Sequence, residues 1–359
     1  MTTNKVTYRQ LMALAFVSLL SPIVRVVPDS SVVFGGKAAW LSPIVAVIPV
    51  LVLFWLIQKL MKNRAPGEGL SHVILKAFGP VLGRIITAVF VLWLTFYTGF
   101  VLRTAVERLL STVYTNSNGT AFTLVILLTA CIAASGQLKS LARTAQVFVP
   151  VITAIVIVVF VLLITDIKTE NLLPVTYYEI DDVLLGSIHM INSVVVFAYF
   201  TFLYGSVQDN SQKKGIGYII GLLVFIAGII VCTIGVLSVD IARSLQSPFF
   251  TMIKNIEFFK VLERIDAIVI TLWVVSDFTY LGSLLNISSD IMMVTVKNKK
   301  RSLWVWVIGG AAFIISFVVS RSAFDLWKVS TIFVPAVNLF LTVIIIPLLL
   351  VVAKLRKVI

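Results

Sequence analysis

Cysteine and histidine are scarce in this sequence, since its 359 residues include only two of each. Cys131 and Cys232 each lie inside an apolar run, as small lipid-facing or core residues do, and His72 and His189 lie far apart. This spacing gives neither a metal site nor a disulfide framework. We therefore expect no metal ion and no organic cofactor.

The short motifs of common enzyme classes are also missing. The sequence contains no GxSxG, HExxH, Walker A or GxGxxG pattern. Nothing therefore supports a hydrolase, a metalloprotease or a nucleotide-driven pump. The prediction is a protein that is not an enzyme.

Charged residues are also scarce in this sequence. Charged residues form 13% of the chain and hydrophobic residues 59%, whereas soluble domains average about 25% and about 45–50%. The mean hydropathy is +1.06, which predicts an all-α polytopic membrane protein. The net charge of +13 comes from basic residues in loops between apolar runs, so we expect a lipid bilayer and no nucleic acid as partner.

Ten apolar windows are long enough to be candidate transmembrane helices, for which about 20 mostly apolar residues are needed. We expect one transmembrane domain over residues 1–359, with repeats at about 8–165 and 183–353. The ten windows are 8–27, 38–60, 83–109, 120–134, 145–164, 183–204, 216–239, 265–293, 303–319 and 331–353.

Loop charges predict the orientation of these spans. With ten spans both termini lie on one side, and that side holds most of the 29 Lys and Arg residues with only Glu68 and Asp209 as acids. The loop around residues 166–182 on the other side is acidic. By the positive-inside rule both termini face the cytoplasm.

The spans divide into two halves of five, which suggests an inverted repeat of the kind found in transporters. Amphipathic stretches at 67–78 and 248–260 occupy equivalent positions in the two halves. Ser21-Pro22 in span 1 and residues 200–205 in span 6 are helix disturbers at related depths. We expect discontinuous helices 1 and 6; the simpler alternative is a proline kink in a helical bundle.

Charged side chains at membrane depth are costly and point to function or to a partner. Arg103 and Glu107 are one turn apart in span 3, so we expect them to form an ion pair. Asp277 interrupts apolar span 8 together with Thr279 and Tyr280. Asp277 could couple protons or cations, face a ligand amine, or serve as a structural partner for Arg25 or for another helix.

Aromatic and hydroxyl side chains gather in spans 3 and 6, where they either line a site or simply face lipid or core. Combined with the span 1 disturbance and Asp277, they give a candidate ligand site between helices 1, 3, 6 and 8. Its predicted ligand-binding residues are Ser21, Pro22, Arg25, Tyr97, Tyr199, Thr201, Tyr204, Asp277 and Thr279.

The segment 261–281, VLERIDAIVITLWVVSDFTYL, resembles the signature that opens span 8 in spore-germination receptor B subunits, the GerAB-like permeases. The matching positions are Glu263, Arg264, Asp266 and Trp273. Further similar stretches occur in order along the chain, at 39–41, 77–83 and 102–107.

This resemblance implies the amino acid–polyamine–organocation superfamily, with a LeuT-like fold of ten helices. It also implies a subunit that senses a nutrient beside germinant receptor A and C subunits in the spore inner membrane. Related permeases carry a glycine-rich break in span 1, whereas side chains occupy residues 18–25 here. Arg25 would then either replace backbone amides as the partner of a ligand carboxylate or exclude the ligand.

Three functions fit these observations. The favoured one is a nutrient-sensing subunit that binds a small molecule, expected to be an amino acid, and then changes state. The second is a proton-coupled amino-acid symporter with Asp277 as the titrating group. The third is an ion conduit of the germination complex.

Overall fold

The computed structural model describes residues 5–114, 117–208, 215–245, 247–254, 265–298, 300–319 and 323–358, without the side chains of 25, 26, 29, 265, 266, 323 and 324. These residues form helices and one isolated bridge between Val6 and Val207. The N-terminal half comprises α1 (Tyr8–Gly35), η1 (Gly36–Leu41), α2 (Ser42–Met61), α3 (Leu70–Thr112), α4 (Gly119–Ser135) and α5 (Leu138–Leu163).

After three short 3₁₀ turns, the second half begins with α6 (Ile180–Val195) and the 3₁₀ helix η5 (Val196–Ser206). The next elements are α7 (Ile216–Leu237), α8 (Val239–Ser244), α9 (Pro248–Lys254), α10 (Ile265–Val296) and α11 (Arg301–Val318). The last elements are α12 (Ala323–Lys328), the π-helix η7 (Val329–Phe333), α13 (Val334–Leu339), the π-helix η8 (Phe340–Ile345) and α14 (Ile346–Leu355).

The helices are long and apolar enough for a multi-pass membrane protein, as predicted. Within the described ranges, eight helical stretches reach the length and composition of a membrane span. Two shorter apolar helices, Tyr8–Val24 and Gly119–Ser135, lie where spans 1 and 4 are expected. Each of the ten predicted windows falls on one of these ten stretches, while the number of membrane crossings stays a prediction.

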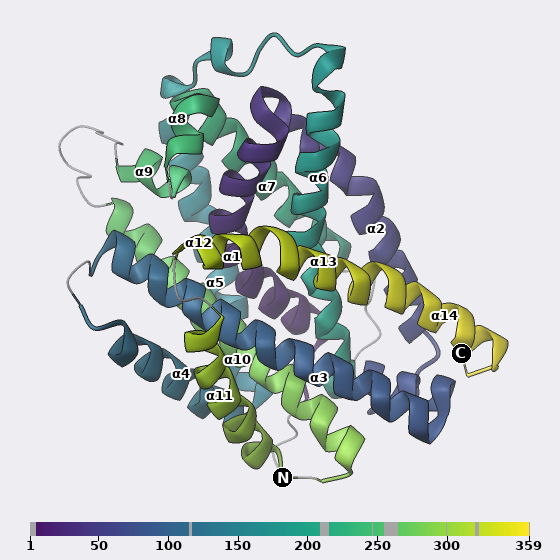
Figure 1. Cartoon of the computed structure of the whole chain (residues 1–359). Coiled ribbons are helices and arrows are strands. Elements are labelled where there is room, and N and C mark those ends of the chain that lie inside the picture. Colours follow the sequence, from purple (N-terminus) through teal and green to yellow (C-terminus); the bar gives the residue numbers. More distant parts are fainter. Residues whose placement is uncertain are drawn as a thin grey trace.

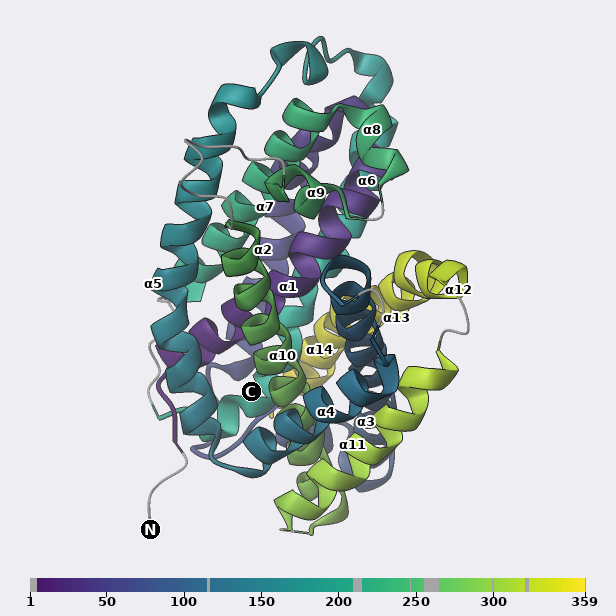
Figure 2. The same cartoon turned by 90° about the vertical axis from the view of Figure 1, so that its left-hand side faces the viewer.

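Helix α1 lies at the centre of the arrangement. It packs against α5, α6, α7 and α10, and α10 in turn packs against α3 and α4. Figures 1 and 2 show α3, α4, α10 and α11 gathered at one end, with the yellow α12–α14 crossing the bundle. Most described side chains of α1 are buried.

The amphipathic stretch 67–78 supplies the first turns of α3, and Gly79 sets the bend that follows. Gly79 has φ 79°, a left-handed conformation that glycine adopts without steric cost. Pro80 then starts the long apolar part of the same helix. In the second half, α9 covers Pro248–Lys254 of the stretch 248–260, and residues 255–260 lie outside the described residues.

The expected interruption of helix 1 is wrong, because α1 is a single α-helix that contains Pro22 and Pro28. Instead, a side chain of α10 forms hydrogen bonds with the backbone of one turn of α1. The Ser276 hydroxyl of α10 donates to the carbonyl oxygen of Val17 at 2.6 Å and accepts from the Ser21 N–H at 2.8 Å. Since these two backbone groups have a polar partner at membrane depth, the helix can pass Pro22 without unwinding.

Helix 6 is not interrupted either. It changes winding from α to 3₁₀ at Val196 and continues to Ser206. The disturbance expected at 200–205 therefore belongs to an eleven-residue 3₁₀ helix rather than to a break. A 3₁₀ helix of this length is uncommon, because the hydrogen-bond geometry of a 3₁₀ helix is poorer than that of an α-helix and most such runs end within about four residues.

Replacing Ser276 with alanine should destabilise the protein by about 1–3 kcal/mol, because the buried backbone groups of Val17 and Ser21 lose their hydroxyl partner. Thermal or denaturant unfolding of the detergent-solubilised protein measures this. Ser288→Ala is the matched control on α10, because within the described part of the chain the buried Ser288 hydroxyl bonds to Leu284 of its own helix and to no other helix. Equal losses in the two variants would contradict the bridging role.

Candidate ligand-binding site

A buried ion pair joins α3 to α10. The guanidinium of Arg108 bonds through Nη2 to Oδ2 of Asp277, and each residue is only 6% exposed. The hydroxyl of Ser21 on α1 donates to the other carboxylate oxygen, Oδ1, at 2.5 Å. One carboxylate therefore ties three helices together in an interior where an uncompensated charge would be strongly unfavourable.

The Arg108 guanidinium also lies over the Trp273 ring, 5.1 Å from its centroid. Trp273 precedes Asp277 by four residues, so helical spacing puts both side chains on one face of α10. Asp277 and Trp273 thus both hold the Arg108 guanidinium, Asp277 by its charge and Trp273 by its aromatic face.

A small polar cavity of about 30 Å³ adjoins this ion pair. A space of this size holds roughly two water molecules. Its walls come from α1, α3, α6, α10, η7 and α13, and its lining residues are Ser21, Pro22, Tyr97, Phe100, Val101, Thr104, Arg108, Asn192, Ser193, Asp277, Ser330 and Val334.

Two polar atoms of this cavity's lining residues lack a hydrogen-bond partner among the described residues. They are Nε of Arg108, a donor, and Oδ1 of Asn192, an acceptor. Asn192 is only 5% exposed, and leaving such a group unpaired in an interior costs about 1–3 kcal/mol. The cavity therefore offers a positive donor, a carboxylate and a free amide acceptor to a small polar molecule.

The structure brings together four of the predicted site residues, because Ser21, Pro22, Tyr97 and Asp277 all line this cavity. The Tyr97 hydroxyl accepts a hydrogen bond from Tyr280 at 3.0 Å. Arg25 lies on α1, but its side chain is outside the described residues.

The other predicted residues do not line this cavity. Tyr199 donates to Oδ1 of Asn338 at 2.8 Å and accepts from Trp93 at 3.0 Å, and the hydroxyl of Tyr204 lies 3.2 Å from that of Tyr8.

The hydroxyls of Thr201 and Thr279 donate to backbone carbonyls of Ala198 and Val275 within their own helices. Their part in ligand binding, like that of Tyr199 and Tyr204, stays a prediction.

The family model described as "Spore germination protein" matches residues 5–324 of the chain. The chain belongs to the spore germination protein family. The resemblance stated from the sequence is thereby confirmed, although Glu263 and Arg264 and the side chain of Asp266 lie outside the described residues.

Two curated relatives of this spore germination protein come from Bacillus subtilis (strain 168). Spore germination protein KB is 23% identical over 335 residues, which cover 90% of this chain and 87% of the relative. The putative spore germination protein YfkT is 23% identical over 238 residues, covering 66% of this chain and 65% of the relative. The printed names of both relatives describe spore germination proteins.

Sequence reasoning on this germination protein missed Arg108 and Asn192. The sequence does carry a signal for Arg108. Its spacing from Tyr97, Val101 and Thr104 is the i, i+4, i+7, i+11 spacing of one helix face, which predicts that all four side chains point the same way. The other arginine of this helix, Arg103, pairs with Glu107 at 2.5 Å as predicted. Asn192 carries no comparable pattern, and only packing of α6 against the other helices reveals it.

We expect Arg108→Gln to destabilise the protein by about 3–5 kcal/mol, because Asp277 is left as a buried charge without its counter-ion. The double variant Arg108→Gln/Asp277→Asn should recover most of that loss. Arg103→Gln on the same helix is the control, since its partly exposed pair is worth about 1 kcal/mol or less.

Unfolding in detergent measures all three variants. A double variant that is less stable than Arg108→Gln by the full cost of Asp277→Asn would show that the two residues act independently.

Proposed function

We propose that this protein is a nutrient-sensing transmembrane subunit of a spore germinant receptor, with its ligand site in the polar cavity between α1, α3, α6 and α10. The observation that carries the proposal is the buried pairing of Arg108 with Asp277 beside the free amide oxygen of Asn192. Family membership supplies the germination context.

The chemistry of this cavity suits an amino acid. A ligand carboxylate would bond to the Arg108 guanidinium, whose Nε is free within the described structure. A ligand ammonium group would donate to Oδ1 of Asn192 and to the Asp277 carboxylate. A zwitterion therefore offers a partner for each of the three polar groups without adding net charge to the interior.

Ligand entry would also change the protein, because a cavity of about 30 Å³ holds only about two waters. An amino acid has to separate the helices that Asp277 ties together, and so it binds one conformation better than the other. Such differential affinity is what a ligand needs in order to drive a switch.

The proposal includes a LeuT-like arrangement of ten crossings in one domain over residues 1–359, with repeats at about 8–165 and 183–353. Packing of α1 on α6 and of α3 on α10 supports it, since each pair unites equivalent helices of the two halves. Both termini would face the cytoplasm. The inner spore membrane and germinant receptor A and C subunits would be its location and partners.

The second candidate is a proton-coupled amino-acid symporter, favoured by a carboxylate, Asp277, that is buried in an apolar span. The ion pair with Arg108 weighs against it, because Asp277 already has a compensating charge inside the protein. An ion conduit within the germination complex remains the third candidate.

Uptake and binding of a labelled amino-acid panel in proteoliposomes test the proposal. We expect at least one amino acid to bind without accumulating under an inward proton gradient. Asn192→Leu should weaken that binding about tenfold, the equivalent of about 1.4 kcal/mol, whereas Ser187→Ala should not, because the buried Ser187 lies outside the cavity lining and donates to Leu184 of its own helix.

Gradient-dependent accumulation would make the protein a symporter. A folded protein that binds no member of the panel would refute an amino-acid sensor.

A further inference from the structure

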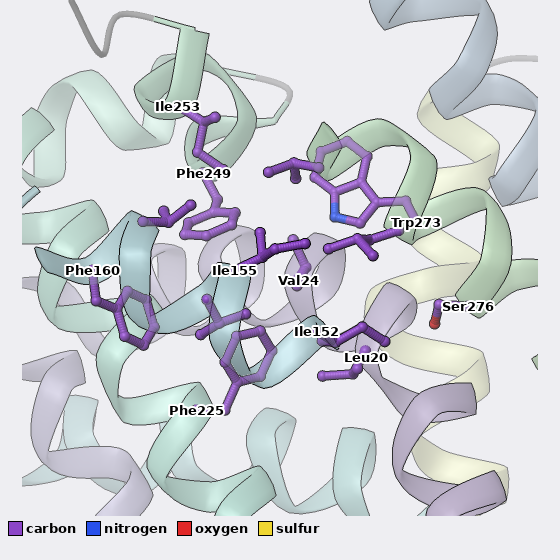
Figure 3. Close-up of a pocket in the computed structure, with 14 residues that line it drawn as sticks. Leu20, Val24, Ile152, Ile155, Phe160, Phe225, Phe249, Ile253, Trp273 and Ser276 are labelled. Carbon is purple, nitrogen blue, oxygen red and sulfur yellow. The ribbon is translucent and has the colours of Figure 1, made fainter. Parts of the chain in front are cut away.

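An apolar cavity of about 40 Å³ lies in the interior between α1, α5, α7, α9 and α10. Figure 3 shows Phe249 and Trp273 at one side of it and Phe160 and Phe225 at another. In this conformation the space holds at most about three water molecules, and its walls are almost entirely hydrocarbon. The exposed surface carries a stronger candidate for a second site, where α2 and α14 end.

Two lysine side chains face each other at the ends of α2 and α14. These helices pack against one another (Figure 1), and the amino group of Lys59 lies within hydrogen-bonding reach of Lys354. Lys59 is on the last turn of α2 and Lys354 on the last turn of α14, and both are exposed. Because like charges so close together repel each other, an anion between them would be stabilised by both.

The sequence around this pair carries no acidic residue. Residues 30–67 contain no Asp or Glu, and neither do residues 326–359. Lys62, Arg356 and Lys357 flank the pair in the sequence and are exposed as well. We name these five cations the basic surface, which consists of Lys59, Lys62, Lys354, Arg356 and Lys357.

Other cations near these helix ends already have partners within the protein. Lys76 pairs with Glu68 at 2.5 Å, and Arg64 donates to two backbone carbonyls at 3.3 and 3.4 Å. Among the described residues, no carboxylate lies within ion-pair distance of Lys59 or Lys354. The positive charge of the basic surface is therefore left for a partner outside the chain.

An apolar stripe leads along α2 to the basic surface. One face of this helix, with the spacing i, i+4, i+7 and i+11, carries Ile48, Val52, Trp55 and Lys59. The three apolar side chains are 71%, 48% and 56% exposed, and the Lys59 amino group lies 4.7 Å from the centre of the Trp55 ring. On a helix of membrane-spanning length, a Trp and a Lys at the end of an apolar stripe are typical of the level of the lipid headgroups.

We propose that the basic surface and this stripe bind an anionic phospholipid of the membrane. The lipid phosphate lies between the ammonium groups of Lys59 and Lys354, which donate charge-assisted hydrogen bonds to it, and an acyl chain follows the stripe on α2. Basic clusters between membrane helices recognise anionic headgroups through the same chemistry. The site is separate from the proposed ligand site, because neither α2 nor α14 lines the polar cavity.

Binding should depend on both parts of the lipid. The wild-type chain should hold phosphatidylglycerol at least about tenfold more tightly than phosphatidylcholine with the same acyl chains, because only phosphatidylglycerol carries a net negative charge. Glycerol 3-phosphate should not displace it, because that molecule has the phosphate without the acyl chains that contact the stripe.

The decisive variant is Lys59→Gln/Lys354→Gln. A lysine near an anionic lipid surface contributes a factor of about five to affinity, so this variant should bind phosphatidylglycerol about 25-fold more weakly. Its binding of phosphatidylcholine should not change. Lys59→Arg/Lys354→Arg keeps both charges and should keep the preference. Mass spectrometry of the intact full chain released from detergent counts the bound lipid molecules as each lipid is titrated.

Lys297→Gln/Lys300→Gln is the matched control, since it removes the same charge from two exposed lysines at the turn between α10 and α11. Its phosphatidylglycerol binding should stay close to that of the wild type. Because all four lysines are exposed, each variant should unfold in lipid-free detergent at the wild-type temperature, which shows that it is folded.

Equal weakening in the Lys59/Lys354 variant and in the control would show that net charge, rather than a site, attracts the lipid, and would overturn the inference. Equal binding of the two lipids by the wild-type chain would overturn it as well. Displacement by glycerol 3-phosphate would do the same, because the site would then take a free phosphate and not a lipid.

Discussion

The ion pair between Arg108 and Asp277 is the interaction on which the rest of this structure depends. Arg108 and Asp277 are the two charged residues among the described residues that are buried, and neither charge would be tolerated there alone. Because Ser21 shares the same carboxylate, the pair also fixes α1 against α3 and α10. The polar cavity borders directly on this junction.

Two consecutive residues of α10 hold α1 at its proline turn. The Ser276 hydroxyl forms hydrogen bonds with the backbone groups of Val17 and Ser21, and the Asp277 carboxylate accepts a hydrogen bond from the Ser21 hydroxyl. A proline normally weakens the helix that contains it, but here the neighbouring helix supplies the polar partners. Any ligand that competes for Asp277 would therefore act directly on the turn of α1 that follows Val17, which gives ligand binding a physical route to a conformational change.

The sequence by itself determined the membrane class, the positions of the apolar helices and the family. Hydrophobic composition and the length of apolar runs are local properties, and the thickness of the bilayer sets how long such a run must be. It also determined the pairing of Arg103 with Glu107, which depends only on helical spacing. Asp277 stood out for the same reason, as a charge within an apolar run.

Only the tertiary structure decided which residues meet Asp277. Arg108, Ser21 and Asn192 come from three different helices, and no spacing along the chain specifies how those helices pack. The continuity of α1 was likewise a tertiary outcome, since a proline that should break an isolated helix is accommodated once the Ser276 hydroxyl of another helix reaches the bonds around it.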